Sequence, residues 1–223
     1  EAREQIRRLG SNNIILRSAK PAEQTQAKSG RPGALQYGIT YADLERIATT
    51  LPRVDVIVPT RELRKDVWFR GKRAEGNVVG TIPWYPQVTN SELLTGRFIT
   101  PMDMERAANV CVLSAGLAER LIAIESPVGN TVRVGTDCYE VIGVLEKRSA
   151  PSGEAANALA ETGRELYIPL TAARLRFGEL IVDRQAGSMT MERVELHGAI
   201  VRVTEADDVL QIAGIVERIL KHG

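Results

Sequence analysis

The sequence is poor in the side chains that most enzymes use for catalysis. Its 223 residues include two histidines and two cysteines, and 4% are aromatic. Few groups are therefore present for imidazole, thiolate or stacking chemistry. An enzyme built from this chain would have to work mainly with carboxylates.

The sequence also lacks a large net charge of either sign and any long apolar run. Lys and Arg together number 29, Asp and Glu 28, so the formal net charge is +1. Such a chain has no overall field that attracts nucleic acid, and we expect no nucleic-acid partner. No window approaches the roughly 20 apolar residues that cross a bilayer, and no signal peptide is visible.

What the sequence does contain is typical of a folded globular protein. Hydrophobic residues make up 43% of the chain and charged residues 26%, and the length allows one large domain or two small ones. The sequence starts at Glu1 without a methionine and stops at Gly223 just after a predicted helix. We therefore expect it to be a piece of a longer protein.

Two similar strand-helix units lie near the two ends. The first has an apolar strand over residues 13–17 and a helix that opens at Thr40; the second has a strand over 194–203 and a helix that opens at Thr204. Each threonine is followed three residues later by an aspartate, which is typical of a helix cap. The pair predicts an α+β fold with a ferredoxin-like (split βαβ), porter-type subdomain.

Between these units the pattern changes to short strands and turns, which predicts a smaller mixed α/β insertion subdomain. We assign residues 1–90 and 190–223 to a discontinuous porter-like subdomain and residues 91–189 to the insertion. Strands are expected at 54–58, 65–69 and 77–82, and helices at 1–9, 102–108, 115–122 and 171–177. Residues 18–38 predict a loop, and residues 148–164 a loop or an isolated short helix.

Candidate catalytic groups fail on their sequence context. Ser114 lacks the glycine two residues earlier that a nucleophile elbow needs. Cys111 lies between two valines, as a buried small hydrophobe commonly does. The glycines match neither the phosphate-binding loop nor the dinucleotide fingerprint. We predict no catalytic residue, no cofactor, no cofactor-binding residue and no metal ligand.

Two charged clusters have ordinary interpretations. Carboxylates such as Asp103 near helix starts interact favourably with the helix dipole. A basic cluster around Trp68 and Phe69 has the composition to stack on and neutralise a phosphate backbone, but acidic residues interleave it and favour a solvated hairpin. The basic members are Arg61, Arg64, Lys65, Arg70, Lys72 and Arg73, and the acidic ones are Glu62, Asp66 and Glu75.

Several phrases, taken in order, resemble the extracytoplasmic core domain of MacB-like ABC transporter permeases, the family of macrolide exporters and lipoprotein-releasing permeases. They are Leu9-Gly10-Ser11-Asn12, Asp43-Leu44, Leu51-Pro52-x-Val54, Leu94-Thr95-Gly96-Arg97-Phe98, Pro127-Val128-Gly129-Asn130-Thr131-Val132, Tyr139-Glu140-Val141-Ile142-Gly143-Val144 and Tyr167-Ile168-Pro169-Leu170. Together they span nearly the whole chain. The loops 18–38 and 148–164 match no phrase of the family.

The resemblance implies a domain on the periplasmic face of the inner membrane, anchored by membrane helices outside this sequence. It implies an ABC ATPase on a separate domain or chain, a periplasmic adaptor protein, and a permease that is a homodimer or heterodimer. The domain would pass ATP-driven conformational change to the extracytoplasmic side for export or lipoprotein release. The alternative is a porter-like or adaptor-type binding module for a small molecule or lipid, outside any ABC permease.

The two cysteines leave one question open. Cys111 and Cys138 both lie on predicted strands of the insertion. An extracytoplasmic location permits a disulfide between them, which would stabilise the fold by about 3–4 kcal/mol. Both residues also sit among apolar strand residues, where free buried cysteine is common. The sequence therefore names Cys111 and Cys138 as a candidate disulfide without deciding it.

Overall fold

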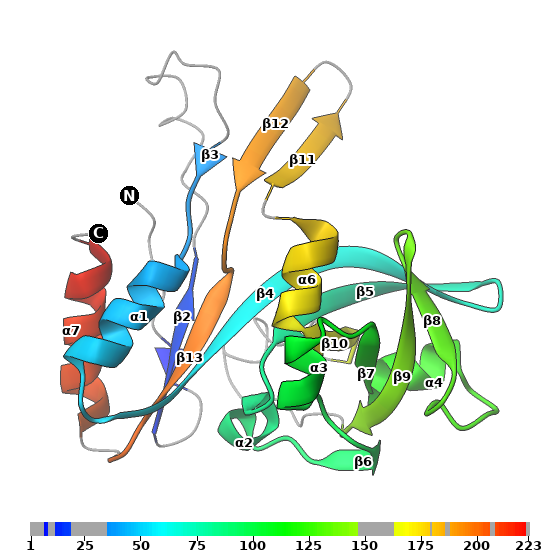
Figure 1. Ribbon diagram of the computed structural model, residues 1–223, viewed down its shortest axis with the longest axis horizontal. Helices are drawn as coiled ribbons and strands as arrows, with labels where there is room; N and C mark the ends of the chain where they lie inside the picture. Colours follow the sequence, from blue (N-terminus) through cyan, green and yellow to red (C-terminus); the bar gives the residue numbers. More distant parts are fainter. Residues whose placement is uncertain are drawn as a thin grey trace. The chain divides into compact units, whose positions relative to one another are not determined.

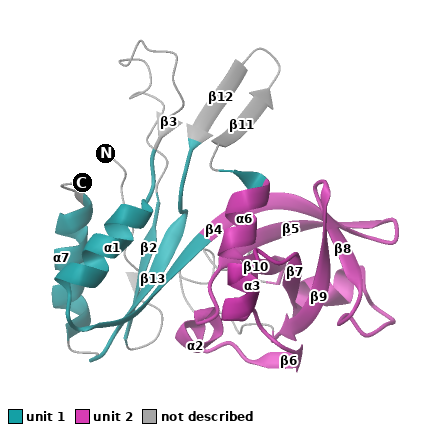
Figure 2. Ribbon diagram, in the orientation of Figure 1, with its two compact units in different colours: residues 1–60, 177–223 teal, residues 61–176 magenta. Residues whose placement is uncertain are grey.

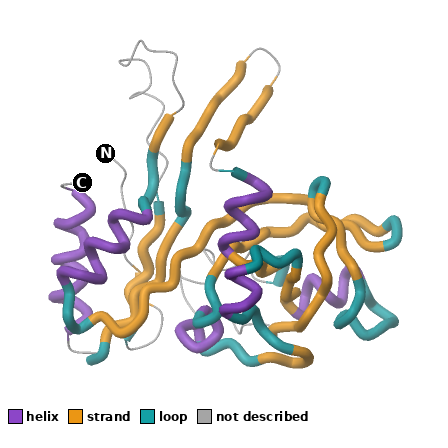
Figure 3. Tube along the Cα trace, viewed as in Figure 1, coloured by secondary structure: helices purple, strands orange, loops and turns teal. Residues whose placement is uncertain are grey.

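The computed structural model describes residues 7–8, 12–18, 35–146, 163–178, 180–185, 188–205 and 208–221. Strands outnumber helices in this part of the chain (Figures 1 and 3). The strands are β1 Arg7–Arg8, β2 Asn13–Arg17, β3 Leu35–Gln36, β4 Val54–Phe69, β5 Lys72–Thr81, β6 Leu93–Gly96, β7 Val110–Ser114, β8 Thr131–Val134, β9 Asp137–Leu145, β10 Glu165–Pro169, β11 Leu180–Gln185, β12 Ser188–Arg193 and β13 Gly198–Val203. The helices are α1 Tyr41–Thr50, α2 Tyr85–Thr89, α3 Pro101–Glu105, α4 Ala115–Leu121, α6 Leu170–Phe177 and α7 Val209–Lys221. None of these helices is long and apolar enough to cross a membrane.

The chain divides into two compact units, residues 1–60 with 177–223 (unit 1) and residues 61–176 (unit 2) (Figure 2). Strand β4 contributes to both. Its residue Thr60 pairs with Gly198 of unit 1, and the next residue, Arg61, pairs with Gly80 of unit 2. The first boundary therefore falls inside a strand, whereas the division expected from the sequence assigned residues 61–90 to the porter-like subdomain.

Unit 1 is built on the strand order β1-β2-β13-β4, and β13 runs antiparallel to both β2 and β4. Helix α7 packs against β2 and α1. A second sheet in the order β11-β12-β3 belongs to the same unit. Side chains with no solvent exposure form the core between the first sheet and its helices: Ile14, Ile47, Val58, Val201 and Val216.

The helix start predicted at Thr40 is confirmed. Thr40 Oγ1 accepts from the backbone N–H of Asp43 at 3.1 Å, and the Asp43 carboxylate accepts from the Thr40 N–H at 2.9 Å. This reciprocal pair satisfies donors that would otherwise be orphaned at the start of α1. Thr204 behaves differently, since its hydroxyl donates to the carbonyl of Arg53 at 3.1 Å. Helix α7 begins five residues later, at Val209, and Asp207 lies outside the described residues.

Other sequence predictions in unit 1 need correction. The helix expected at 1–9 is described only at Arg7–Arg8, which form a strand paired with β2. Most of the expected loop 18–38 lies outside the described residues, but Leu35–Gln36 form β3, which pairs with β12. Strand β3 depends on pairing with β12, a segment far away in the sequence, which local composition does not reveal.

Unit 2 contains a ring of six paired strands. β4 pairs with β5, β5 with β10, β10 with β7, β7 with β9, β9 with β8, and β8 with β4. Because successive strand residues point to opposite faces, a closed ring buries one face of every strand. Fully buried side chains on the ring include Arg61, Val67, Val78, Cys111, Val132, Val134, Tyr139, Val141 and Leu166.

The other elements of unit 2 attach to this ring. β6 pairs with β9 at the end of the strand order, and α4 packs against β5 and β7. Helix α6 comes so close to β5 that a Cβ built on Gly80 would lie 2.6 Å from the Ala173 Cβ. The helices expected at 102–108, 115–122 and 171–177 correspond to α3, α4 and α6, and no end differs from the expected one by more than three residues.

Strand β4 is one continuous strand where the sequence pattern predicts two, at 54–58 and 65–69. The residues between them also pair, first with β13 and then with β5. β5 starts at Lys72, five residues earlier than expected, because the turn is confined to Arg70–Gly71. The inward-facing residues in this early part of β5 are Ala74 and Gly76. Because both are small, the alternation of apolar and polar residues that predicts a strand is weak there. Residues 148–162 of the second expected loop lie outside the described residues.

Candidate functional site

The Gly96-Arg97-Phe98 turn joins the end of β6 to β9. The Arg97 backbone N–H donates to the Ile142 carbonyl at 2.9 Å, and Gly96 has φ +76°. A Cβ on Gly96 would collide with the Ile142 carbonyl oxygen, and one on Gly143 would collide with the Arg97 carbonyl oxygen. Glycines at both positions therefore allow two backbones to approach more closely than any side chain permits. We call residues 96–98 with Gly143 the Gly-Arg-Phe clasp.

The Arg97 side chain extends the clasp to α3. Its guanidinium donates to both carboxylate oxygens of Asp103, at 2.6 and 3.2 Å, and also to the Phe98 carbonyl at 3.1 Å. Asp103 is buried, and its Oδ2 accepts from the Thr100 N–H at 2.8 Å and from the Thr100 hydroxyl at 2.7 Å. The carboxylate thus anchors the start of α3 and holds Arg97 at the same time.

Electrostatics in the clasp favour the charged pair. Burial acts to raise the pKa of Asp103, but hydrogen bonds from Arg97 and Thr100 outweigh it and hold that pKa below its usual value. The hydrogen bond to Asp103 raises the pKa of Arg97. From the sequence alone, Asp103 is explained by the helix dipole, and its Arg97 partner is not visible. The usable signal was the Thr-x-x-Asp spacing, which recurs at Thr100.

Phe98 anchors the clasp in an aromatic cluster. Its ring lies 6.4 Å from that of Tyr85 in α2 and 6.1 Å from that of Tyr167 in β10, while the two tyrosine rings are 5.1 Å apart. Such separations are favourable for aromatic pairs. All three side chains are buried. The Gly-Arg-Phe and Tyr-Ile-Pro-Leu segments are therefore in contact in the folded chain, through Phe98 and Tyr167.

The Pro-Val-Gly-Asn turn before β8 forms backbone hydrogen bonds with the middle of β9, which is the Tyr-Glu-Val-Ile-Gly-Val segment of the sequence. The Gly129 N–H donates to the Val141 carbonyl at 2.8 Å, and the Val141 N–H donates to the Asn130 carbonyl at 2.8 Å. Gly129 has φ +88°, a conformation that favours glycine. Four of the segments that carried the family resemblance thus form one connected set of contacts in unit 2.

A shallow hollow of about 430 Å³ lies on unit 2 where β4, β5 and the start of β10 come together. Asp66 and Glu75 face each other across the two strands, a like-charge pair that is unfavourable alone. Arg73 bonds Asp66 at 2.9 Å and Arg164 approaches Glu75 at 3.5 Å, which offsets the repulsion. The lining residues are Arg64, Lys65, Asp66, Glu75, Gly76, Asn77 and Arg164. This lining offers polar contacts and contains no cysteine, serine or histidine.

The groups weighed for catalysis lie in structural positions. Ser114 ends β7 and precedes α4; its hydroxyl is buried and makes no hydrogen bond within the described chain. Cys111 is fully buried in β7, and burial raises the pKa of its thiol. Among the described residues, no three His, Cys, Asp or Glu side chains gather closely enough to hold a metal ion.

The side chains of Cys111 in β7 and Cys138 in β9 face opposite sides of the sheet. Cys111 pairs across β7 and β9 with Val141, which is buried, whereas Cys138 is three residues from Val141 and exposed. An odd separation along a strand places side chains on opposite faces. Both cysteines are free thiols in the structure. The strand register therefore favours two unpaired thiols, and oxidation experiments decide the candidate disulfide.

Comparison with known proteins identifies the family. The sequence profile of the MacB-like periplasmic core domain matches residues 1–219. The macrolide export ATP-binding/permease protein MacB of Bdellovibrio bacteriovorus is 25% identical over 181 residues, which is 80% of this chain and 26% of that protein. The pyoverdine export ATP-binding/permease protein PvdT of Pseudomonas fluorescens Pf0-1 is 24% identical over 198 residues, or 86% of this chain and 28% of that protein. The chain thus spans about a quarter of these relatives.

Solved structures show the same fold. The periplasmic region of MacB from Actinobacillus actinomycetemcomitans matches with a TM-score of 0.68 and 16% identity, covering 96% of this chain and 85% of that one. The extracellular domain of the noncanonic ABC-type transporter YknZ from Gram-positive bacteria matches with a TM-score of 0.65 and 19% identity, covering 95% and 94%. Fold and profile agree, and the chain belongs to the family of MacB-like periplasmic core domains.

Proposed function

We propose that this chain is the periplasmic domain of an ABC transporter permease and that it passes ATP-driven conformational change from membrane helices to the extracytoplasmic side. The domain itself performs no chemical step. In this proposal the ATP hydrolysis that drives it belongs to a separate domain or chain; the relatives are named ATP-binding/permease proteins. Export of a small molecule, or release of a lipoprotein, is the work that results.

The observation that carries this proposal is the path of the chain through its two units. Both ends of the described chain lie in unit 1 (Figures 1 and 2). Unit 2 is an insertion reached by two crossings, at residues 60/61 and 176/177. A displacement applied to the chain ends therefore enters unit 1 first and reaches unit 2 through these crossings. The proposed function places membrane helices at those ends.

We propose further that unit 1 is the ferredoxin-like, split βαβ layer of a porter-type subdomain. The order β2-β13-β4 places an antiparallel strand between two strands that are parallel to each other and joined through α1. The second strand-helix unit, β13 with α7, follows in the sequence. Unit 2 then takes the role of the inserted mixed α/β subdomain. This assignment moves the proposed subdomain boundaries from 90/91 and 189/190 to 60/61 and 176/177.

Partners follow from the same proposal. The chain acts with an ABC ATPase and a periplasmic adaptor protein, as part of a dimeric permease in the inner membrane. The aromatic cluster around Phe98, the close glycine contacts of the clasp and the Arg97–Asp103 ion pair hold α2, α3, β6, β9 and β10 together within unit 2. A unit fixed in this way can move as one body, which mechanical transmission requires.

The test lengthens one of the two crossings in the full-length permease. A Gly-Ser-Gly insertion after Gly178, an exposed residue with φ +58° next to the second crossing, is compared with the same insertion after Gly135, an exposed hairpin turn with φ +62°. ATP hydrolysis and macrolide export are measured together in membrane vesicles. We expect the Gly178 insertion to retain hydrolysis and lose export, while the Gly135 insertion retains both. Equal export per ATP in both variants would overturn the proposal and favour a binding module.

A further inference from the structure

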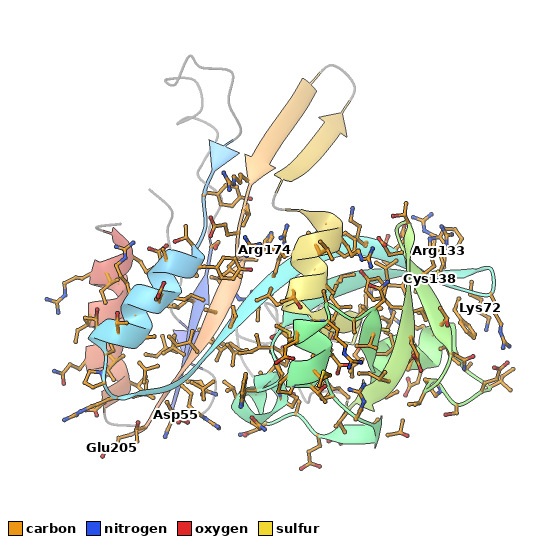
Figure 4. All side chains as sticks on the ribbon, in the orientation of Figure 1. Asp55, Lys72, Arg133, Cys138, Arg174 and Glu205 are labelled. Atoms are coloured by element: carbon orange, nitrogen blue, oxygen red, sulfur yellow. The ribbon has the colours of Figure 1, made fainter. Side chains whose placement is uncertain are left out.

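The outer face of the strand ring carries a row of side chains that the proposed function does not use. Trp68 of β4 pairs across the sheet with Arg73 of β5 on one side and with Arg133 of β8 on the other, and Arg133 in turn pairs with Cys138 of β9. Figure 4 labels Arg133 and Cys138 on β8 and β9. We call Arg73, Trp68 and Arg133 the arginine-tryptophan row.

Both guanidinium groups of the row lie against the same ring. The Cζ atom of Arg133 is 5.3 Å from the Trp68 ring centroid and that of Arg73 is 5.7 Å from it. Cation-π attraction holds each arginine there, and it orients the guanidinium without using its N–H donors. Two like charges are thereby held near one ring, which is unfavourable unless anions neutralise them.

The described residues neutralise only one of the two charges. Arg73 bonds the Asp66 carboxylate at 2.9 Å. Arg133 donates to the Gly135 carbonyl at 3.3 Å and has no carboxylate within ion-pair distance in the described chain. A guanidinium has five N–H donors, and Arg133 is exposed, so donors beyond the one bonded to Gly135 remain accessible to a ligand. The nearby hairpin adds Lys72, which is exposed.

We infer that the arginine-tryptophan row is a binding site for a phosphate group. A phosphate presents several oxygens to a guanidinium fork and can accept two parallel hydrogen bonds from Arg133, while its charge offsets that of the same guanidinium. The indole supplies a flat apolar support beside it. Asp66 limits the charge at the site, so the ligand is a single phosphate and not a long polyanion. The inference does not depend on the proposed transport function.

The test uses Trp68 as the reporter. In a Trp84→Phe background Trp68 is the single tryptophan, and its fluorescence is followed as inorganic phosphate is added at constant ionic strength. We expect saturation with a dissociation constant on the order of 1 mM, as a few charge-assisted hydrogen bonds allow. Arg133→Gln is expected to weaken binding about tenfold, and Arg133→Lys to weaken it less. The control is Arg120→Gln, an exposed arginine on α4, which should leave binding unchanged.

Vesicles of POPC, with and without POPG, distinguish the source of the phosphate. Binding to POPG vesicles that Arg133→Gln removes assigns the site to a lipid headgroup. Binding of free phosphate with no vesicle binding assigns it to a soluble phosphorylated ligand. The inference is overturned if fluorescence changes linearly with phosphate, or if the Arg133 and Arg120 variants respond alike while retaining the wild-type thermal unfolding curve.

Discussion

Arg97 and Asp103 form a two-point ion pair, with N–O distances of 2.6 and 3.2 Å, that joins the end of β6 to the start of α3. Because Asp103 is buried, removing its partner leaves a charged carboxylate short of donors. Arg97→Ala should therefore lower the free energy of unfolding by about 1–3 kcal/mol. Urea denaturation of the 223-residue chain measures this. A loss equal to that of the surface variant Arg120→Ala would show that the pair carries no stability.

The same pair predicts a pH dependence. The pKa of folded Asp103 lies below its usual value, so the unfolded chain binds a proton at this site more readily than the folded one. The stabilisation is present at neutral pH and is lost as the pH falls below about 4, through the folded pKa. Asp103→Asn should flatten this part of the curve of unfolding free energy against pH. An unchanged acid slope in Asp103→Asn would contradict the assignment.

The close backbone approach in the clasp predicts unequal glycine substitutions. A Cβ at Gly143 collides with the Arg97 carbonyl oxygen, whereas a Cβ at Gly214 in the interior of α7 meets nothing within 4 Å. We expect Gly143→Ala to cost about 3 kcal/mol, since backbone must shift. Gly214→Ala should instead stabilise the chain by about 0.5–1 kcal/mol, because alanine favours helix. Thermal unfolding measures both effects: the melting temperature should fall for Gly143→Ala and rise for Gly214→Ala.

Tyr139 offers a test of the ring interior. Burial, and then the neighbouring Asp137, raise the pKa of Tyr139 to about 12. The unfolded phenol ionises near its usual value of about 10, so the stability of the chain should fall as the pH rises from about 10 to 12. Its hydroxyl has no hydrogen-bond partner among the described residues. Tyr139→Phe should therefore fold as well as the parent and lose this alkaline slope; a strongly destabilised variant would reveal a partner for the hydroxyl.

The cysteines give a chemical test of the strand register. Cys138 is exposed and should react with a maleimide in the native protein, while Cys111 should react only after unfolding. Mass spectrometry of unreduced protein, alkylated before and after denaturation, counts the thiols in each state. Recovery of a bridged Cys111–Cys138 peptide would show that β7 or β9 differs from the register described.

Local patterns in the sequence were sufficient for some parts of the fold. The periodic apolar stripe and Thr40 cap predicted α1, and the joint order of the turn phrases identified the family. Contacts between distant segments were not accessible in this way. No local signal showed that β8 pairs with both β4 and β9. The basic hairpin was interpreted as a solvated surface because Arg133, which completes the row at Trp68, lies 65 positions away in the sequence.

The candidate site shows the same limit. The Gly-Arg-Phe phrase was recognisable as a family feature, but its physical reason depends on Gly143 and Asp103 together. One partner lies on another strand and the other on a helix. A single sequence does not show which turn contacts which strand. The hollow at Asp66 and Glu75 likewise depends on Arg164, the residue directly before β10.

The most direct test of the proposed function is a distance measured in the full-length permease. One spin label is placed on the native, exposed Cys138 of unit 2 and another on Leu210→Cys, an exposed position on α7 of unit 1; Cys111 is buried and stays unlabelled. Double electron–electron resonance compares the nucleotide-free permease with the permease holding a non-hydrolysable ATP analogue, diluted with unlabelled subunits. Transmission from the ATPase predicts that the distance distributions differ between the two states. Identical distributions, in a permease that binds the analogue, would contradict it.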